Sequence, residues 1–154
     1  MEKLYRTGLD KFDVGKGKFG MNEEQKGDVA QILVADDDPA ILRLVKAIVE
    51  KEGYAVVSAR DGREAYKLLT SGEQFVAAIF DVVMPYIQGT ELVKHMQSEK
   101  RLMKIPVIMM TAEQNPRLSS ESFASGAVAF LPKPFTTAQL QTMLRMFVQK
   151  NHSA

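Results

Sequence analysis

Acidic, basic and hydroxyl side chains that could form a metal or phosphate site follow separate apolar segments of this chain. Asp36 to Asp38 follow the first such segment, Asp81 and Thr111 end two others, and Lys133 follows another. Carboxylates about 4 Å apart repel each other by roughly 1 kcal/mol in water and by about 4 kcal/mol at an effective dielectric of 20. A hard divalent cation removes this cost, and oxygen ligands with room for water suit magnesium.

Asp81 is the candidate nucleophile of this group, because a carboxylate can accept a phosphoryl group and form an acyl phosphate. Lys133 offers a positive charge and Thr111 a hydroxyl donor, which suit the negative charge of a phosphoryl group in transfer. Each residue also has a structural interpretation. Asp36 to Asp38 could cap a helix, Thr111 could end a strand, and Lys133 could be a solvated surface charge. Only their placement together favours the functional interpretation.

These side chains can meet only if the segments before them are strands of one sheet. The run Phe75 to Phe80 shows no polar alternation, which indicates a strand buried on both faces, and Pro85 prevents further pairing. The predicted strands are Ile32–Ala35, Tyr54–Ala59, Phe75–Phe80, Pro106–Met110 and Val128–Leu131. Helices are predicted from Pro39 after the cap Asp38, from Gly62 after Asp61, and at about Thr90–Glu99, Leu118–Ser125 and Thr136–Gln149.

This alternation predicts an α/β fold, a doubly wound five-stranded parallel sheet with right-handed crossovers. We expect the flavodoxin-like strand order 2-1-3-4-5, in which the first and third strands are neighbours. The carboxyl ends of parallel strands share one edge, and open α/β sheets bind their ligands there. The sequence therefore predicts that the aspartates, Thr111 and Lys133 lie at a single edge.

Residues 1–28 differ in composition from the rest of the chain. They contain five of the ten glycines among mixed charges and keep neither a helical nor a strand period. We expect a flexible N-terminal leader over residues 1–28 and one compact domain over residues 29–154. Met1 or Met21 could be the true start. Only Lys150 to Ala154 follow the last predicted helix, so we expect no further domain there.

The composition argues against several other functions. A net charge of +1 gives no electrostatic reason to expect a nucleic acid or an anionic membrane as partner. The absence of cysteine excludes disulfides, thiolate metal sites and cysteine nucleophiles, and two histidines are too few for a histidine metal cluster. No apolar run approaches membrane-spanning length and the N-terminus lacks a signal-peptide core, so we expect a cytoplasmic protein.

Short segments of the chain together resemble the receiver domain of two-component response regulators. They are Ile32-Leu33-Val34-Ala35-Asp36-Asp37, Asp81 through Met84-Pro85 to Gly89, Met110-Thr111-Ala112, and Lys133-Pro134-Phe135. The resemblance covers about Gln31 to Gln149, and the spacings between the segments fit the family without insertion or deletion.

The resemblance implies that Asp81 accepts a phosphoryl group from the phosphohistidine of a sensor histidine kinase or a phosphotransfer protein. Asp36 and Asp37 would hold Mg²⁺ together with Asp81 and the backbone carbonyl of Val83. The chain would phosphorylate and dephosphorylate itself without being a turnover enzyme. Its output would be binding to a downstream protein target, and the resemblance also allows a homodimer that forms on phosphorylation.

The resemblance also assigns the remaining positions. Thr111 and Lys133 would contact the bound phosphoryl group, and the Lys133–Pro134 peptide bond would be cis. Phe130 would be the aromatic switch that follows Thr111 inward. The family often has tyrosine at this position, so a readout through that hydroxyl is absent here. Val83 and Glu113 are the positions expected to steer the water that hydrolyses the acyl phosphate.

Three other classes of protein fit these residues less well. A phosphatase of the haloacid dehalogenase type needs a second aspartate where Val83 stands. A flavodoxin-like cofactor binder needs a hydroxyl-rich phosphate loop where the chain has Asp36 to Asp38. A degenerate receiver that binds partners without phosphorylation is disfavoured because every key position is present.

Overall fold

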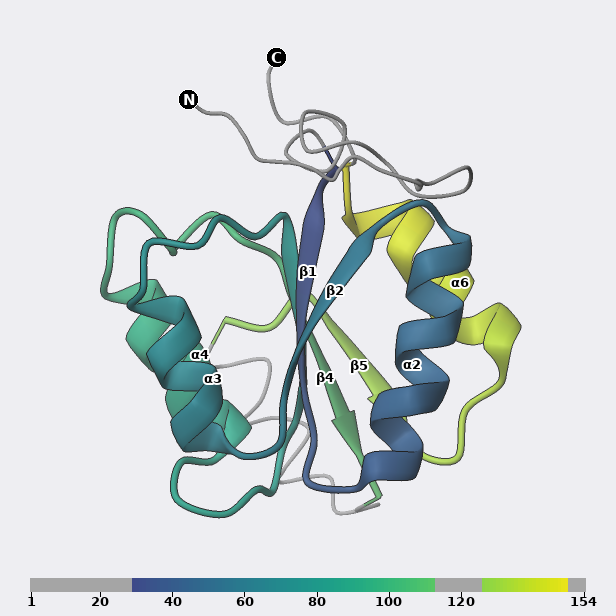
Figure 1. Ribbon diagram of the computed structural model, residues 1–154, viewed down its shortest axis with the longest axis horizontal. Coiled ribbons are helices and arrows are strands. Elements are labelled where there is room, and N and C mark those ends of the chain that lie inside the picture. Colours follow the sequence, from purple (N-terminus) through teal and green to yellow (C-terminus); the bar gives the residue numbers. More distant parts are fainter. Residues whose placement is uncertain (1–28, 113–125, 150–154) are drawn as a thin grey trace, which may run out of the picture.

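In the computed structural model, residues 29–112 and 126–149 are described. Their elements in chain order are β1 (Gln31–Ala35), α2 (Pro39–Lys51), β2 (Ala55–Ala59), α3 (Gly62–Leu69), β3 (Ala77–Asp81), α4 (Gly89–Gln97), β4 (Val107–Thr111), β5 (Ala129–Pro132) and α6 (Thr137–Phe147). Strands and helices therefore alternate along most of this part of the chain (Figure 1). The helix predicted at Leu118–Ser125 and the leader predicted at residues 1–28 lie outside the described residues.

The five strands form one parallel sheet in the order β2-β1-β3-β4-β5, which confirms the predicted topology. In the register of the sheet, Ala35 of β1 pairs with Phe80 of β3, and Asp81 pairs with Met110 of β4. Thr111 in turn pairs with Pro132 of β5. The residues that end β1, β3, β4 and β5 therefore lie side by side at one edge.

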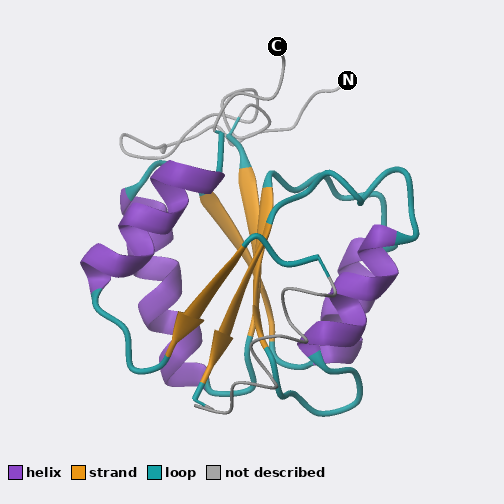
Figure 2. Ribbon diagram, turned by 180° about the vertical axis from the view of Figure 1, so that it is seen from behind, coloured by secondary structure: helices purple, strands orange, loops and turns teal. Residues whose placement is uncertain are grey.

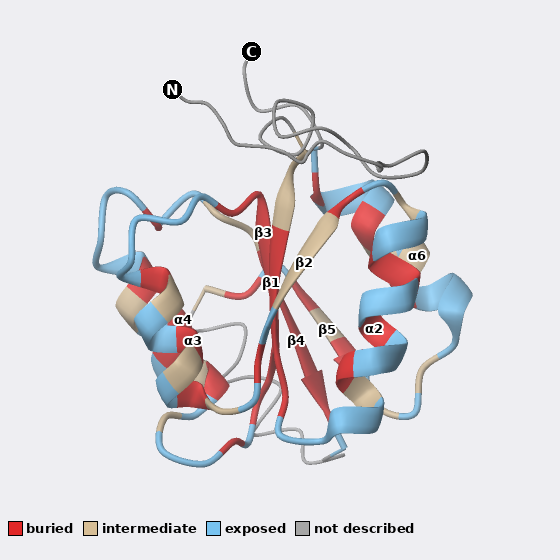
Figure 3. Ribbon diagram, viewed as in Figure 1, coloured by how far each residue is buried: buried red, intermediate tan, exposed pale blue. Residues whose placement is uncertain are grey.

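Two layers of helices cover the sheet, with α2 and α6 on one face and α3 and α4 on the other (Figures 1 and 2). On the first face, Val34 and Ile79 of the sheet pack against apolar residues of α2 and α6 such as Val45 and Leu140. On the second face, Leu33 and Phe80 pack with α3 and α4. The central strands β1, β3 and β4 are almost entirely buried (Figure 3), because helices cover both of their sides.

The helix starts follow the capping chemistry read from the sequence. Asp38 accepts a hydrogen bond from the backbone N–H of Ala40 and has Pro39 at the first helical position of α2. Asp61 accepts one from the N–H of Glu64 at the start of α3. The strand ends differ slightly from the prediction: β3 and β4 include Asp81 and Thr111 as their last residues. Polarity ended the predicted strands, whereas the ladder continues through these residues.

Candidate functional site

Three carboxylates converge at the carboxyl edge of the sheet. Asp36 directly follows β1, and because Ala35 pairs with Phe80, it lies beside Asp81 at the end of β3. One oxygen each from Asp36, Asp37 and Asp81 lies within 4.8 Å of the others. Asp36 is completely buried and Asp81 is 7% exposed, whereas Asp37 faces solvent. The register of two neighbouring strands thus produces the cluster that the sequence predicted.

Lys133 brings a positive charge into this cluster from the segment after β5. Its Nζ lies 2.7 Å from Oδ2 of Asp36 and 3.1 Å from Oδ1 of Asp81. The backbone N–H of Lys133 donates to the carbonyl oxygen of Thr111 at 2.7 Å, which ties this segment to the end of β4. The Lys133–Pro134 peptide bond is cis. The lysine is therefore held against two aspartates that precede it in the chain by many residues.

The electrostatics of the cluster are unbalanced. The pKa of the Asp81 carboxyl is raised to about 6: burial is the largest cause, the charge of Asp36 adds to it, and Lys133 only partly offsets both effects. Burial would lower the pKa of the Lys133 ammonium, but its hydrogen bond to Asp36 and the charge of Asp81 outweigh this, and the net pKa is raised. Three carboxylates near one ammonium group carry excess negative charge, which a bound cation would neutralise.

The donor set of this cluster fits a hard divalent cation. All three side chains offer carboxylate oxygens, and the exposed Asp37 leaves one side open to water. Magnesium takes oxygen ligands and keeps several of its waters, which a carboxylate cluster with one open side allows. Val83, whose carbonyl the resemblance adds to the ligand set, lies two residues after Asp81 with its side chain 53% exposed.

Asp38 belongs to the site only indirectly. Its side chain caps α2 through the N–H of Ala40, so the structural interpretation holds for this aspartate. Its own backbone N–H donates to Oδ1 of Asp36 at 2.9 Å. The start of α2 therefore orients Asp36, whose other oxygen contacts Lys133.

Thr111 and Phe130 lie on the same face of the sheet. Phe130 pairs with Met109, and both belong to the apolar cluster under α3 and α4. Thr111 follows Met109 by two residues, so the alternation of side chains along β4 places it on that face as well. Thr111 is buried and Phe130 is half-buried. Glu113, the second position expected to steer water, lies outside the described residues.

No pattern in the sequence indicated that the start of α3 forms part of the site. The loop after Asp81 contacts Gly62 and Arg63 through its residues Pro85 to Ile87. Gly89 lies against the same strand end, since a Cβ there would be 2.3 Å from the backbone oxygen of Asp81. Gly62, directly after Asp61, is a residue type that permits close backbone packing, but the sequence does not show that Ile87 is the residue packed against it.

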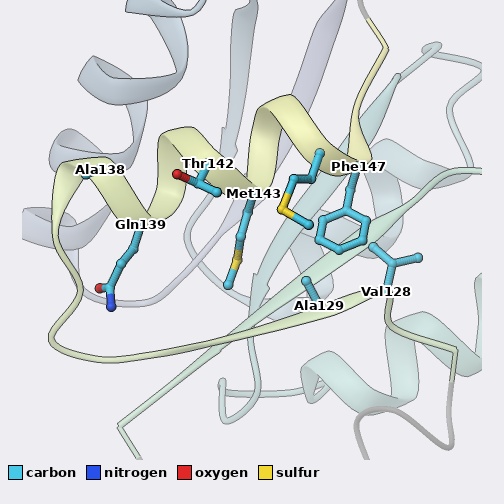
Figure 4. A pocket seen from close by; sticks show the side chains of 8 residues that line it. Val128, Ala129, Ala138, Gln139, Thr142, Met143 and Phe147 are labelled. Carbon is cyan, nitrogen blue, oxygen red and sulfur yellow. The ribbon is translucent and has the colours of Figure 1, made fainter.

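An apolar pocket lies apart from the carboxylates, between α6 and β5 (Figure 4). It is lined by Val128, Ala129, Ala138, Gln139, Thr142, Met143, Met146 and Phe147. The side chains of Met143 and Phe147 point from α6 toward Val128 and Ala129, where β5 begins. None of these residues belongs to the acidic cluster, so the pocket offers an apolar contact surface and no charged chemistry.

Fold and site together define a class of protein: a parallel α/β domain with an acidic cluster and one lysine at the carboxyl edge of its sheet. The family model described as response regulator receiver domain matches residues 32–145. The chain belongs to this family, and its class is that of the receiver domains of two-component signalling.

Relatives and solved structures agree with this assignment. The response regulator GtcR of Aneurinibacillus migulanus is 33% identical over 124 residues, which are 78% of this chain and 50% of the relative. The transcriptional regulatory protein SrrA of Staphylococcus aureus is 28% identical over 123 residues, which are 80% of this chain and 49% of that protein. The chain thus spans about half the length of these curated relatives.

Among solved structures, the chemotaxis response regulator CheY4 of Vibrio cholerae superposes with a TM-score of 0.71 at 34% identity, covering 77% of this chain and 98% of that one. The receiver domain of a signal transduction histidine kinase from Syntrophus aciditrophicus has a TM-score of 0.72 at 31% identity, covering 82% and 97%. Within the described residues, no helix has the length and apolar character needed to cross a membrane.

Proposed function

We propose that this receiver domain accepts a phosphoryl group on Asp81 from the phosphohistidine of a kinase or phosphotransfer protein. The observation that carries the proposal is the convergence of Asp36 and Asp37 on Asp81, with Lys133 Nζ 3.1 Å from the Asp81 carboxylate. Membership of the receiver family supports the same role. A cluster with this much excess negative charge is poorly suited to stability alone, which favours a functional interpretation.

The transfer itself requires little of the protein beyond placement and charge. The nitrogen–phosphorus bond of the donor breaks as a bond forms between phosphorus and an Asp81 oxygen. The donor imidazole leaves with the electron pair of the broken bond and takes up a proton. Because the pKa of Asp81 is about 6, its carboxylate is mostly ionised at pH 7 and can act as the nucleophile.

Lys133 and Thr111 are proposed to bind the phosphoryl group once it is attached. The Lys133 ammonium already contacts the Asp81 carboxylate, so it is within reach of a group bonded to that oxygen. Asp36, Asp37, Asp81 and the carbonyl of Val83 are proposed to hold Mg²⁺. When bound, this ion supplies positive charge that offsets the negative charge of the phosphoryl oxygens.

The output is proposed to be a change in protein binding. Thr111 and Phe130 share one face of the sheet. An inward movement of Thr111 toward the phosphoryl group would therefore open space into which the Phe130 ring can move. Phosphorylation would then favour one of two arrangements by population shift. Phe130 follows Ala129, which lines the apolar pocket, on β5, but its side chain faces α3 and α4 on the other side of the sheet. We place the contact with a downstream protein, or with a second phosphorylated copy, at the β5 edge of the sheet.

Intact mass after incubation with acetyl phosphate and Mg²⁺ tests the proposal. The wild-type protein should gain the mass of one phosphoryl group, and Asp81→Asn should gain none. Asp38→Asn is the matched control, since it removes a neighbouring carboxylate while asparagine can still cap α2. A wild-type protein that gains no mass would instead identify a degenerate receiver that acts without phosphorylation.

A further inference from the structure

The loop that follows Asp81 is fixed to the sheet at its base. The backbone N–H of Val82 donates to the carbonyl oxygen of Met110 on β4 at 2.9 Å. The N–H of Gly89 donates back to the carbonyl oxygen of Val82 at 2.8 Å and closes the loop. Residues 83–88 project from this base, so Val83 lies between an anchored base and the tip of the loop.

The tip of the loop is a strained turn centred on Tyr86. Its φ is 72°, and the N–H of Ile87 donates to the carbonyl oxygen of Pro85 at 2.9 Å. A positive φ with a hydrogen bond across two residues describes a γ-turn of the rare and strained type. A bulky residue at positive φ persists only where the surrounding structure holds it there. Glycine would adopt this conformation without strain.

Helix α3 supplies the contacts that hold this turn. The N–H of Gly62 donates to the Pro85 carbonyl oxygen at 3.2 Å. A Cβ on Gly62 would lie 1.8 Å from the carbonyl oxygen of Ile87, so the two backbones are in direct contact. The guanidinium carbon of Arg63 lies 4.0 Å from the centre of the Tyr86 ring, a cation–π contact. Arg63, near the start of α3, is thus in direct contact with the side chain of the strained residue, Tyr86.

We propose that Arg63 is a positioning residue for the site of Asp81, acting through Tyr86. Its contact with the ring keeps the strained turn populated, and the turn in turn fixes Val83 in the arrangement that completes the cation site. Arg63 touches neither the carboxylates nor the phosphoryl group. This inference rests on the proposed function, because it concerns the Mg²⁺ site that the function requires.

The sign of the effect separates positioning from simple electrostatics. Removal of a positive charge near an acidic site should strengthen the binding of a cation or leave it unchanged. Loss of a positioning contact should weaken it. Lys67, one turn further along α3 and exposed, offers a matched control for the charge.

The test is titration of the full chain with Mg²⁺ by calorimetry, with an unfolding curve in chelator to verify that each variant folds. Arg63→Gln should weaken Mg²⁺ binding about two- to five-fold, the range that a cation–π contact between exposed residues such as Arg63 and Tyr86 supplies. Arg63→Lys should keep most of the affinity, and Lys67→Gln should not weaken it. Tyr86→Gly should bind as the wild type does, and Arg63→Gln should have no further effect in that background.

Each other outcome overturns the inference. If the Arg63→Gln variant binds Mg²⁺ as tightly as the wild type, or more tightly, Arg63 does not position the site. An equal loss with and without Tyr86→Gly shows that Arg63 does not act through the strained turn. If the wild-type protein binds no Mg²⁺, the inference and the proposed function are both overturned. If the wild type and Arg63→Gln bind Mg²⁺ equally well, only the inference is overturned.

Discussion

Lys133 and Asp36 form a buried ion pair at the base of the site, with Lys133 Nζ 2.7 Å from Oδ2 of an aspartate that has no exposed surface. The same ammonium group lies farther from Asp81, at 3.1 Å. Its charge is therefore shared, and it compensates Asp36 more closely than Asp81. Burial and the charge of Asp36 therefore outweigh the lysine, and the pKa of Asp81 stays raised even though Lys133 is in contact with it.

Asp81→Asn should stabilise the protein in the absence of divalent cations. The substitution removes one buried charge from a cluster of three carboxylates. We expect a gain of about 1–2 kcal/mol in the free energy of unfolding at pH 7, less than the full pKa shift would supply, because water at the exposed side of the site screens the charges. Urea unfolding in chelator measures the gain. A variant less stable than the wild type would contradict the repulsion described here.

The stability of the wild-type protein should depend on pH through Asp81. Its pKa is raised from 3.8 to about 6 on folding, so the folded state binds the proton more tightly than the unfolded state. The resulting stabilisation is fully present below about pH 4 and is lost as the pH rises through about 6. In chelator, the advantage of Asp81→Asn over the wild type should therefore grow between pH 4 and pH 7. A constant difference across this range would show that Asp81 titrates normally.

Magnesium should raise the melting temperature, since it binds the folded cluster and relieves its repulsion. At ten times the dissociation constant the gain is about 1.4 kcal/mol, or roughly 3–5 °C for a domain of this size. Asp37→Asn should lose this response with little effect on folding in chelator, because Asp37 is exposed. Asp38→Asn, which removes the same charge but keeps the helix cap, should retain it.

Lys133→Met should destabilise the protein by about 3 kcal/mol in chelator, because it leaves the buried Asp36 without its cation. The loss should shrink in millimolar Mg²⁺, which supplies positive charge to the same carboxylates. A second substitution, Asp36→Asn, should recover part of it, and the coupling is measured by a double-mutant cycle. Additive effects of the two substitutions would mean that the ion pair contributes nothing.

The phosphorylated state of the wild type should last longer than that of Val83→Asn. Hydrolysis needs a water in line with the bond between Asp81 and phosphorus, and Val83 offers that water no hydrogen bond. Its side chain is exposed two residues after Asp81, where it can shield one side of the site. Decay of labelled protein measures the lifetimes, with Glu113→Ala as a comparison for the second position. A faster decay in the wild type than in Val83→Asn would refute the assignment.

Local patterns in the sequence determined the elements and the edge at which the site lies. Unbroken apolar runs such as Phe75–Phe80 marked buried strands, and Asp38 followed by Pro39 marked the start of α2. These signals are readable because strand burial and helix capping depend on residues close together in the chain. The strand order was taken from flavodoxin-like folds and is not dictated by the sequence; with that order, the convergence of Asp36 and Asp81 at one edge could be predicted.

Only the tertiary structure decided which groups touch within that edge. It placed Lys133 against Asp36, 97 positions away, more closely than against Asp81. It also set the start of α3 against the loop after Asp81, with Arg63 over the ring of Tyr86. Such contacts join loops from distant segments, and no periodicity encodes them. These contacts depend on how the helices pack against the sheet. The distances that result from this packing cannot be read from the order of residues along the chain.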